Sequence, residues 1–279
     1  MSEIYNAKLP SYSVLMSVYA GEKPEFLRQS IDSMINQTYR TDDFVLVCDG
    51  ELTPSLDSLI SEYSEKYSFF RPIRMKKIMG TGICANVGIS ACKNEYIVKM
   101  DSDDIALPER CEVSMKFLCD NPDVDMVGAY IDEFDSDSGD YISTKKTPLS
   151  DKEIREYAKR RNPFNNQTLI YKKSVALKAG GYTNIKRCED YEFVVKMLVG
   201  GAVGANLPQV LVKYRVTADN YARRKNWKNT KSFISVRWKI FRMGFSKFPD
   251  FLIPCLMQMI IFILPSSLTG KIYRKFLRN

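Results

Sequence analysis

Histidine is absent from this 279-residue sequence. Its absence excludes Ser-His-Asp and Cys-His nucleophilic sites, histidine-ligated zinc and acid-base catalysis by imidazole. If the chain is an enzyme, we therefore expect carboxylates to transfer its protons and to bind any hard metal ion. Hydrophobic residues make up 45% of the chain and charged residues 27%, so it can bury a core and is not a disordered protein.

Disulfide and export signals are also missing. The N-terminal sequence MSEIYNAKLPSYS has neither the basic stretch nor the apolar run of a secretory signal, so no export is expected. The cysteines include no CxxC pair and no tight cluster, and we interpret them as reduced thiols of a cytosolic protein, mostly in its core. They are Cys48, Cys84, Cys92, Cys111, Cys119, Cys188 and Cys255.

The C-terminal region is strongly basic. Residues 222–279 contain 13 Lys and Arg and a single acid, Asp250, so this segment has a net charge of +12. The whole chain has a net charge of +8, so residues 1–221 have a net charge of −4. Within it, residues 251–264 (FLIPCLMQMIIFIL) form a charge-free run of 14 residues. At about 1.5 Å per residue, this run is too short to cross a hydrocarbon layer of roughly 30 Å.

An anionic membrane surface is the partner that this composition favours. We expect a helical region over 222–279 that lies in the interface, with apolar side chains among the acyl chains and Lys and Arg on anionic headgroups. An ordinary core helix or a subunit contact with a solvated basic face is the alternative. No nucleic-acid partner is expected, because the apolar run outweighs any interleaving of aromatic and basic residues.

Apolar runs alternate with helical patterns in the N-terminal half of the chain. This order predicts an α/β fold, with a Rossmann-like, mainly parallel sheet and helices on both faces. Ligands of such sheets bind beyond the carboxyl ends of the strands. The expected elements are strand 13–18, helix 24–39, strand 44–48, helix 56–67, short strand 71–76, a closely packed helix 82–92 and strand 96–100.

The strongest local signal is YIVKMDSDDIALPER, where a buried strand runs directly into Asp101, Asp103 and Asp104. Three carboxylates at one strand end repel one another unless a cation or hydrogen-bond donors compensate them. Mg²⁺ or Mn²⁺ suits such oxygen ligands, and a nucleotide diphosphate can complete the coordination. The alternative is that Asp103 or Asp104 caps a helix starting near Pro108, without a metal.

Other candidates carry weaker signals. Asp49 follows a strand and precedes a glycine, so it either accepts hydrogen bonds from a base or ribose or forms an Asp-Gly turn. Glu189 and Asp190 start a helical pattern, where acids also favour the helix dipole. Residues 180–181 are both glycine and more typical of a helix end than of substrate contact. The polar stretch 165–168 could line an acceptor pocket or satisfy a turn.

Taken in order, these motifs resemble a known family. From about residue 13 to residue 216 the sequence is similar to bacterial family 2 glycosyltransferases with the GT-A fold, especially those that build O-antigen and capsule repeat units. The resemblance rests on SVLMSVYAGEKPEFLRQSIDSMINQTY, VLVCDGE, GTGICANVGI, YIVKMDSDDIALPER, NPFNNQTLIYKKSVALKAGGY, CEDYEFVVKML and LPQVLVKYRV.

The resemblance implies a nucleotide-sugar pocket. Tyr19 and Asp49 would lie around the uridine and Asn86 near the pocket. Many relatives have two acids after the second strand where this chain has Cys48 and Asp49, so base recognition differs there. Relatives often carry a histidine shortly after the motif that ends in Arg215, and this chain has none.

The resemblance also implies the catalytic roles. Asp101 and Asp103 would hold the donor diphosphate, Asp103 chiefly through Mn²⁺ or Mg²⁺, and Asp104 would support them or touch the donor sugar. Glu189 and Asp190 match the ED motif of the family, in which the aspartate is the general base.

The chemistry of inverting transfer agrees with this assignment. A direct displacement at the anomeric carbon needs one carboxylate to deprotonate the acceptor hydroxyl and a positive group to neutralise the leaving diphosphate. Asp190 can supply the first. A metal on Asp103, aided by Arg215, Arg223 or Arg224, can supply the second.

We therefore predict two regions: residues 1–221 as a GT-A nucleotide-sugar-binding and catalytic domain, and residues 222–279 as the membrane-associating region. The predicted enzyme sits on the cytoplasmic face of the bacterial inner membrane. It moves glucose or galactose from a UDP-sugar to an undecaprenyl-diphosphate-linked sugar and forms a β-linkage. One alternative is a nucleotidyltransferase, although a Gly-rich basic loop is missing after the first strand. The other is a non-catalytic, membrane-tethered nucleotide-sugar-binding protein.

Overall fold

The computed structural model describes residues 9–217 and 227–263. In these ranges the strands are β1 (Tyr12–Tyr19), β2 (Asp43–Asp49), β3 (Phe70–Arg74), β4 (Tyr96–Met100), β5 (Ile105–Ala106), β6 (Met126–Asp135), β7 (Tyr141–Lys145), β8 (Ile170–Lys172) and β9 (Gly204–Val216). The helices are α1 (Pro24–Ile35), α2 (Pro54–Lys66), α3 (Thr81–Ala91), α4 (Arg110–Asp120), α5 (Asp151–Ala158), α6 (Lys173–Lys178), α7 (Glu189–Val199), α9 (Trp227–Arg242) and α10 (Phe248–Ile263), with a 3₁₀ turn η1 (Asn166–Thr168).

These strands form one sheet with the order β3-β2-β1-β4-β8-β6-β9-β5, and β7 pairs with β6. The first four strands pair in parallel, as the sequence predicts. β8 runs antiparallel to β4 and β6, a reversal that the sequence did not indicate. Since β1 and β2 are parallel and Tyr19 pairs with Asp49, the carboxyl ends of these strands lie side by side.

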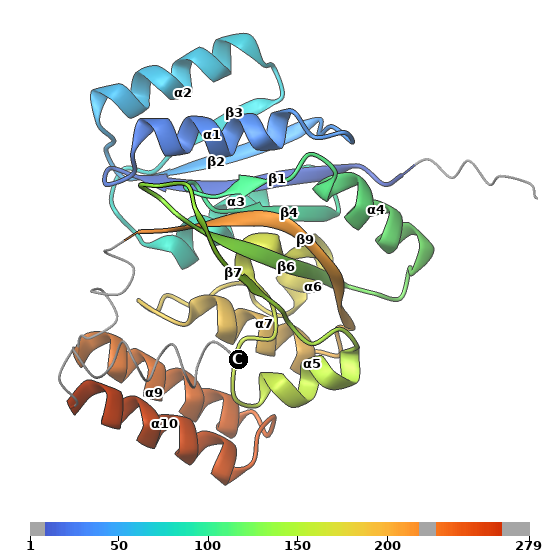
Figure 1. Ribbon diagram of the computed structural model, residues 1–279, viewed down its shortest axis with the longest axis vertical. Helices are drawn as coiled ribbons and strands as arrows, with labels where there is room; N and C mark the ends of the chain where they lie inside the picture. The colour runs from blue at the N-terminus through green and yellow to red at the C-terminus, as the bar shows by residue number, and fades with distance from the viewer. Residues whose placement is uncertain (1–8, 218–226, 264–279) are drawn as a thin grey trace, which may run out of the picture.

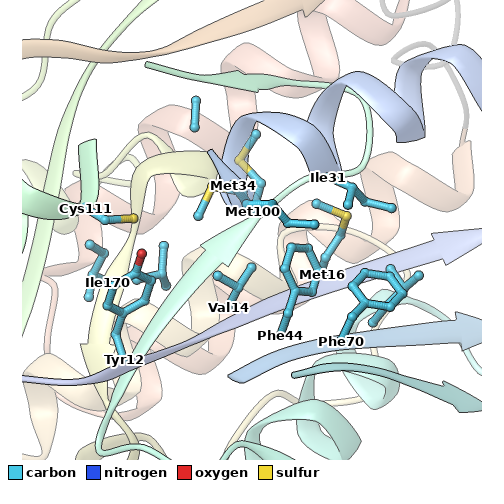
Figure 2. Packing of buried hydrophobic residues seen from close by; sticks show 14 of the residues in the cluster. Tyr12, Val14, Met16, Ile31, Met34, Phe44, Phe70, Met100, Cys111 and Ile170 are labelled. Carbon is cyan, nitrogen blue, oxygen red and sulfur yellow. The ribbon is translucent and has the colours of Figure 1, made fainter. Parts of the chain in front are cut away.

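Alternation along the strands sends side chains into two hydrophobic layers. Val14 and Met16 face the layer beneath α1, α2 and α4, whereas Leu15 faces the layer that contains α3, α5, α6 and α7. Figure 2 shows the first layer, with Val14 and Met16 of β1 packed near Ile31 and Met34 of α1. Each fully buried aliphatic side chain of this kind contributes about 1.5–3 kcal/mol. The resulting arrangement of helices on both faces of the sheet is visible in Figure 1.

Helix boundaries differ from the predictions by one to four residues, and two of these differences affect the interpretation. α1 ends at Ile35 rather than at residue 39, because the next residues leave the helix to bond another segment: the amide of Thr38 donates to the carbonyl oxygen of Pro108 at 2.9 Å. α4 begins at Arg110 with Glu109 at the N-cap position and no side-chain cap. Asp103 and Asp104 therefore do not cap this helix, and the capping alternative was wrong.

α9 and α10 form an antiparallel pair below the sheet domain (Figure 1). Val236 and Ile240 of α9 belong to the second hydrophobic layer, and Asp250 of α10 pairs with Arg160 at 2.7 Å. The hairpin therefore packs directly on the sheet domain. Within the described ranges, none of the helices combines the length and hydropathy that a membrane crossing requires.

Candidate active site

The acidic turn after β4 is held in place by neighbouring elements. The hydroxyl of Ser30, in α1, donates to the backbone oxygen of Asp101 at 2.7 Å. The hydroxyl of Ser102 donates to the carboxylate of Glu22, in the loop after β1, at 2.6 Å. These contacts fix the turn against the carboxyl end of β1, where ligands of parallel sheets bind.

Arg215, near the end of β9, holds the other side of the turn. Its amide donates to Oδ1 of Asp104 at 2.9 Å and its Nε donates to the backbone oxygen of Asp103 at 2.7 Å. The guanidinium lies 4.0 Å from the ring centre of Phe26 and 4.8 Å from that of Phe134, and the residue is 4% exposed. The guanidinium is thus enclosed and orders the acidic turn, and its predicted aid to the leaving diphosphate stays a prediction.

Burial and mutual repulsion perturb the acids of this turn. Burial raises the pKa of Asp103 to about 7, and the neighbouring Asp101 and Glu22 add to the rise. Burial also raises the pKa of Asp104 well above its usual range, with Asp103 and Asp101 acting in the same direction. Oδ2 of Asp104 is buried without a hydrogen-bond partner. The turn therefore holds more negative charge than its surroundings compensate.

Lys99 forms an ion pair with one of these acids, and the sequence analysis missed it. Its Nζ is 2.6 Å from Oδ1 of Asp101, and the residue is 6% exposed. Burial lowers the pKa of this ammonium, but Asp101, Asp190 and Glu189 outweigh that effect and raise it above its usual range. Lys99 thus links the carboxylates after β4 to those at the start of α7.

The start of α7 has an unusual backbone. Cys188 adopts φ 65°, and within the described ranges it is the non-glycine residue with a positive φ. A left-handed conformation costs of order 1–3 kcal/mol for such a residue, and strain of this kind clusters at functional sites. It directly precedes Glu189 and Asp190, the first residues of the helix.

Glu189 and Asp190 are both partly desolvated. Burial raises the pKa of Glu189 to about 7, and Asp190 adds to the rise. Burial raises the pKa of Asp190 too, while Lys99 lowers it, Asp101 raises it, and the side chains of Asn166 and Tyr182 lower it. Oδ1 of Asp190 is buried without a hydrogen-bond partner. A carboxylate with a free lone pair and a raised pKa is suited to accept a proton.

Tyr19 and Asp49 occupy adjacent strand ends, as their predicted roles require. The side chain of Tyr19 is 46% exposed. Asp49 accepts the amides of Met79 at 2.7 Å and of Gly80 at 3.0 Å, so its carboxylate orders the loop before α3. Gly50 has φ 82°, which is typical of the turn that the Asp-Gly pair indicated.

Asn86 lies on α3 and ties that helix to the segment before α7. Its Nδ2 donates to the backbone oxygen of Tyr182 at 2.8 Å, and its Oδ1 accepts the amide of Tyr182 at 2.7 Å. The preceding Gly181 has φ 62°, and a Cβ there would clash with Oδ1 of Asn86. Asn86 and the glycine pair therefore hold α3 against the segment before α7, as expected for the glycines, and the position of Asn86 near a nucleotide-sugar pocket stays a prediction.

The remaining predicted residues have other outcomes. Arg223 and Arg224 lie outside the described residues. Asn165 donates to the backbone oxygens of Ala129 and Lys145 and supports the turn before β8, whereas Oδ1 of Asn166 is buried without a partner. In the described ranges, no three Cys, Asp or Glu side chains are grouped closely enough to hold a metal ion by themselves.

Comparison with known proteins agrees with this geometry. The sequence profile of Glycosyl transferase family 2 matches residues 13–178. A UDP-Gal:alpha-D-GlcNAc-diphosphoundecaprenol beta-1,3-galactosyltransferase of Escherichia coli is 33% identical over 270 residues, covering 97% of this chain and 98% of the relative. The chain belongs to glycosyl transferase family 2. This membership favours glycosyl transfer over the nucleotidyltransferase alternative.

A further relative agrees on the family, and solved structures agree on the fold. An amylovoran biosynthesis glycosyltransferase of Erwinia amylovora is 34% identical over 225 residues, which are 81% of this chain and 84% of the relative. S. aureus TarS 1–349 superposes with a TM-score of 0.66 at 16% identity, over 95% of this chain and 75% of that structure. A Pyrobaculum calidifontis mannosyltransferase in complex with GDP-Man and Mn2+ superposes with a TM-score of 0.65 at 16% identity, over 94% of this chain and 72% of that structure. The predicted GT-A fold is thus confirmed.

Proposed function

We propose that this glycosyltransferase moves a hexose from a UDP-sugar to a polyprenyl-diphosphate-linked sugar, with inversion to a β-linkage. The observation that carries the proposal is that Asp101 and Asp190 both act on the buried Lys99, whose Nζ lies 2.6 Å from Oδ1 of Asp101, while Asp103 lies in the same acidic turn as Asp101. The E. coli relative, named for transfer of galactose from UDP-Gal to a GlcNAc-diphosphoundecaprenol, supports this substrate class. UDP-galactose and UDP-glucose are the donors we favour.

In this proposal Asp190 is the general base. Its unpartnered Oδ1 accepts the proton of the acceptor hydroxyl while that oxygen attacks the anomeric carbon and the bond to the diphosphate breaks. Lys99 keeps the base ionised, because its positive charge lowers the pKa of Asp190. Tyr19 and Asp49, at the ends of β1 and β2, would border the uridine. No covalent nucleophile is needed.

A divalent cation fits the acidic turn. Asp101 and Asp103 offer carboxylate oxygens, which suit Mn²⁺ or Mg²⁺. Burial raises the pKa of Asp103 to about 7, and an added positive charge would relieve the repulsion from Asp101 and Glu22 that adds to the rise. When bound, such an ion would neutralise charge on the diphosphate. Asp104, whose carboxylate accepts the backbone amide of Arg215, would support Asp101 and Asp103. Arg223 and Arg224 are proposed to assist the leaving diphosphate.

The acceptor determines where the enzyme works. A polyprenyl-diphosphate-linked sugar resides in a membrane, so we propose that residues 1–221 form the catalytic domain and that residues 222–279 bring it to the cytoplasmic face of the inner membrane. The excess of Lys and Arg in the second region supports this division. The attraction between anionic headgroups and each Lys or Arg near the surface contributes about 1 kcal/mol to membrane binding.

Release of UDP from several UDP-sugars tests the proposal directly. The purified full chain is mixed with UDP-galactose, UDP-glucose or UDP-GlcNAc and a synthetic sugar-diphosphate-lipid, with Mn²⁺ or with EDTA. We expect metal-dependent transfer from one hexose donor, and a rate that falls by about 10²–10⁴ in Asp190→Asn with donor affinity kept. The exposed Asp123→Asn is the matched control and should retain full activity.

Two results would contradict the proposal. Absence of transfer with every donor and acceptor, despite UDP binding, would favour the non-catalytic nucleotide-sugar-binding alternative. Equal loss of UDP-sugar binding and of transfer in Asp190→Asn would make Asp190 a donor ligand instead of a base.

A further inference from the structure

One face of α10 is apolar and open to solvent. Phe251, Cys255, Gln258 and Phe262 point toward α9, where Gln258 bonds Thr230 at 3.3 Å and the rings of Phe251 and Trp238 lie 5.5 Å apart. The opposite stripe, spaced by three or four residues, points away from α9. It consists of Leu252, Ile253, Leu256, Met257, Ile260 and Ile263, which are 37–74% exposed, and we call it the α10 face.

The exposed residues of α9 are basic or aromatic, apart from the neutral Ser235. Lys228, Lys231 and Arg242 are exposed along one stripe of α9, together with Trp238, which is 46% exposed. Among residues 227–263 the single acid is Asp250, and it is buried against Arg160. The solvent-facing surface of the hairpin thus combines apolar and positively charged side chains without an exposed acid in the described residues.

Rigid packing beneath the hairpin fixes its orientation. Lys239 pairs with the buried Glu192 of α7 at 3.1 Å, and the guanidinium of Arg237 lies 5.0 Å from the ring centre of Tyr191. α7 is the helix that begins with Glu189 and Asp190. Figure 1 shows α10 at the lower edge of the molecule, and the first turn of α9 lies on the side where β9 ends beside the acidic turn.

From this arrangement we infer that the α10 face is a membrane-docking surface, whose occupant is the interfacial layer of a bilayer that contains anionic lipid. The apolar stripe enters the acyl boundary, while Lys231 and Arg242 of α9 meet phosphate headgroups and Trp238 lies at the polar boundary. The inference rests on the proposed function for its biological purpose: contact through α10 holds the start of α7 at a fixed height above a lipid-linked diphosphate.

Charge complementarity decides between a bilayer and a second copy of the chain. Two copies joined through their α10 faces would bring the Lys and Arg stripes of both α9 helices close together, with no exposed acid on the described hairpin to pair with them. An anionic lipid surface satisfies the same cations and covers the apolar stripe at once.

Flotation with lipid vesicles tests the surface without any substrate. The full chain is mixed with phosphatidylcholine vesicles that contain or lack phosphatidylglycerol, and the bound fraction is measured after a density gradient. We expect binding to anionic vesicles and a loss of about tenfold or more in the partition coefficient for Leu256→Asp combined with Ile260→Asp. The matched control is Leu177→Asp on α6, which alters a leucine with nearly the same exposure, 51% against 53%, and should float like the wild type.

Charge variants give a second measurement. Lys231→Gln combined with Arg242→Gln keeps the apolar stripe, so we expect weaker binding to anionic vesicles only, with a smaller dependence on salt. Transfer to a short-chain, water-soluble acceptor should stay unchanged in every variant, which shows that the fold is intact and separates failure of docking from failure of the proposed activity.

Three outcomes would overturn the inference. The first is equal flotation of the wild type and the α10 variant, and the second is no flotation of the wild type with either vesicle. The third is a wild-type dimer in sedimentation that becomes monomeric in the α10 variant while neither protein binds vesicles, which would assign the face to a second copy.

Discussion

Replacing Glu189 with glutamine should stabilise the protein while impairing the site. Burial raises the pKa of this carboxyl to about 7 from an ordinary value of 4.5, and the charge of Asp190 contributes. The native state therefore holds a proton that the unfolded chain has already released at intermediate pH. Glutamine resembles the protonated form and has no charge to desolvate.

The sign and size follow from linkage. Below about pH 4.5 both states are protonated, and this group costs nothing. As the pH rises to about 7, wild-type stability falls progressively, because the native carboxyl is the weaker acid. A shift of one unit in pKa changes the free energy of unfolding by about 1.4 kcal/mol. A rise to about 7 therefore destabilises the wild type by about 3 kcal/mol above pH 7 and by about 1 kcal/mol near pH 5.

Urea unfolding of the metal-free protein measures this difference. We expect Glu189→Gln to increase the free energy of unfolding by about 3 kcal/mol at pH 8, with the gain shrinking as the pH is lowered. Glu65→Gln, on the exposed side of α2, is the control and should change stability by less than about 0.5 kcal/mol. A gain in the free energy of unfolding that is absent at pH 8, or that is equal at pH 8 and pH 5, would refute the reasoning that desolvation of Glu189 destabilises the fold.

Four further outcomes follow from the same site. Lys99→Met should lower the free energy of unfolding by about 2–3 kcal/mol in a denaturant titration, because it leaves the neighbouring carboxylates without their cation. This magnitude is set below that of a fully buried ion pair, because the side chain of Asp101 is 35% exposed. Arg215→Lys should raise the KM for the donor more than it lowers kcat in initial-rate assays, because lysine cannot hold the acidic turn and the two aromatic rings as the guanidinium does. Gly181→Ala should cost about 1–3 kcal/mol in thermal unfolding, through its positive φ and a clash with Asn86; Gly139→Ala, which has φ 78° but open space, should cost less. The rate of transfer should fall on acidification at a higher pH than for an ordinary aspartate, since burial raises the pKa of Asp190 and only its ionised form is a base; a rate constant down to pH 4 would exclude this role.

Local patterns in the sequence were sufficient for the parallel strands β1 to β4 and for the acidic turn. Strand β4 follows the predicted bounds, and β1 and β2 differ from theirs by one residue at each end. These strands are buried on both faces, so their apolar runs are continuous, and parallel strands place their carboxyl ends at one edge. The position of the Asp101 turn beyond β4 could therefore be predicted from the sequence.

The electrostatic partners of the site could not be found in this way. Lys99 lies within an apolar run and gives no pattern of its own; only burial beneath both acidic segments makes it the compensating cation. Arg215 meets the acidic turn from a strand that lies 111 residues further along the chain. The direction that the apolar side chains of α10 face likewise depends on how that helix packs against α9.

The sequence by itself determined the alternation of strands and helices, the acids at strand and helix ends, and the family, because each depends on neighbouring residues. Only the tertiary structure decided which charges meet, since Coulomb interactions and desolvation depend on distance and burial between segments that are remote in sequence.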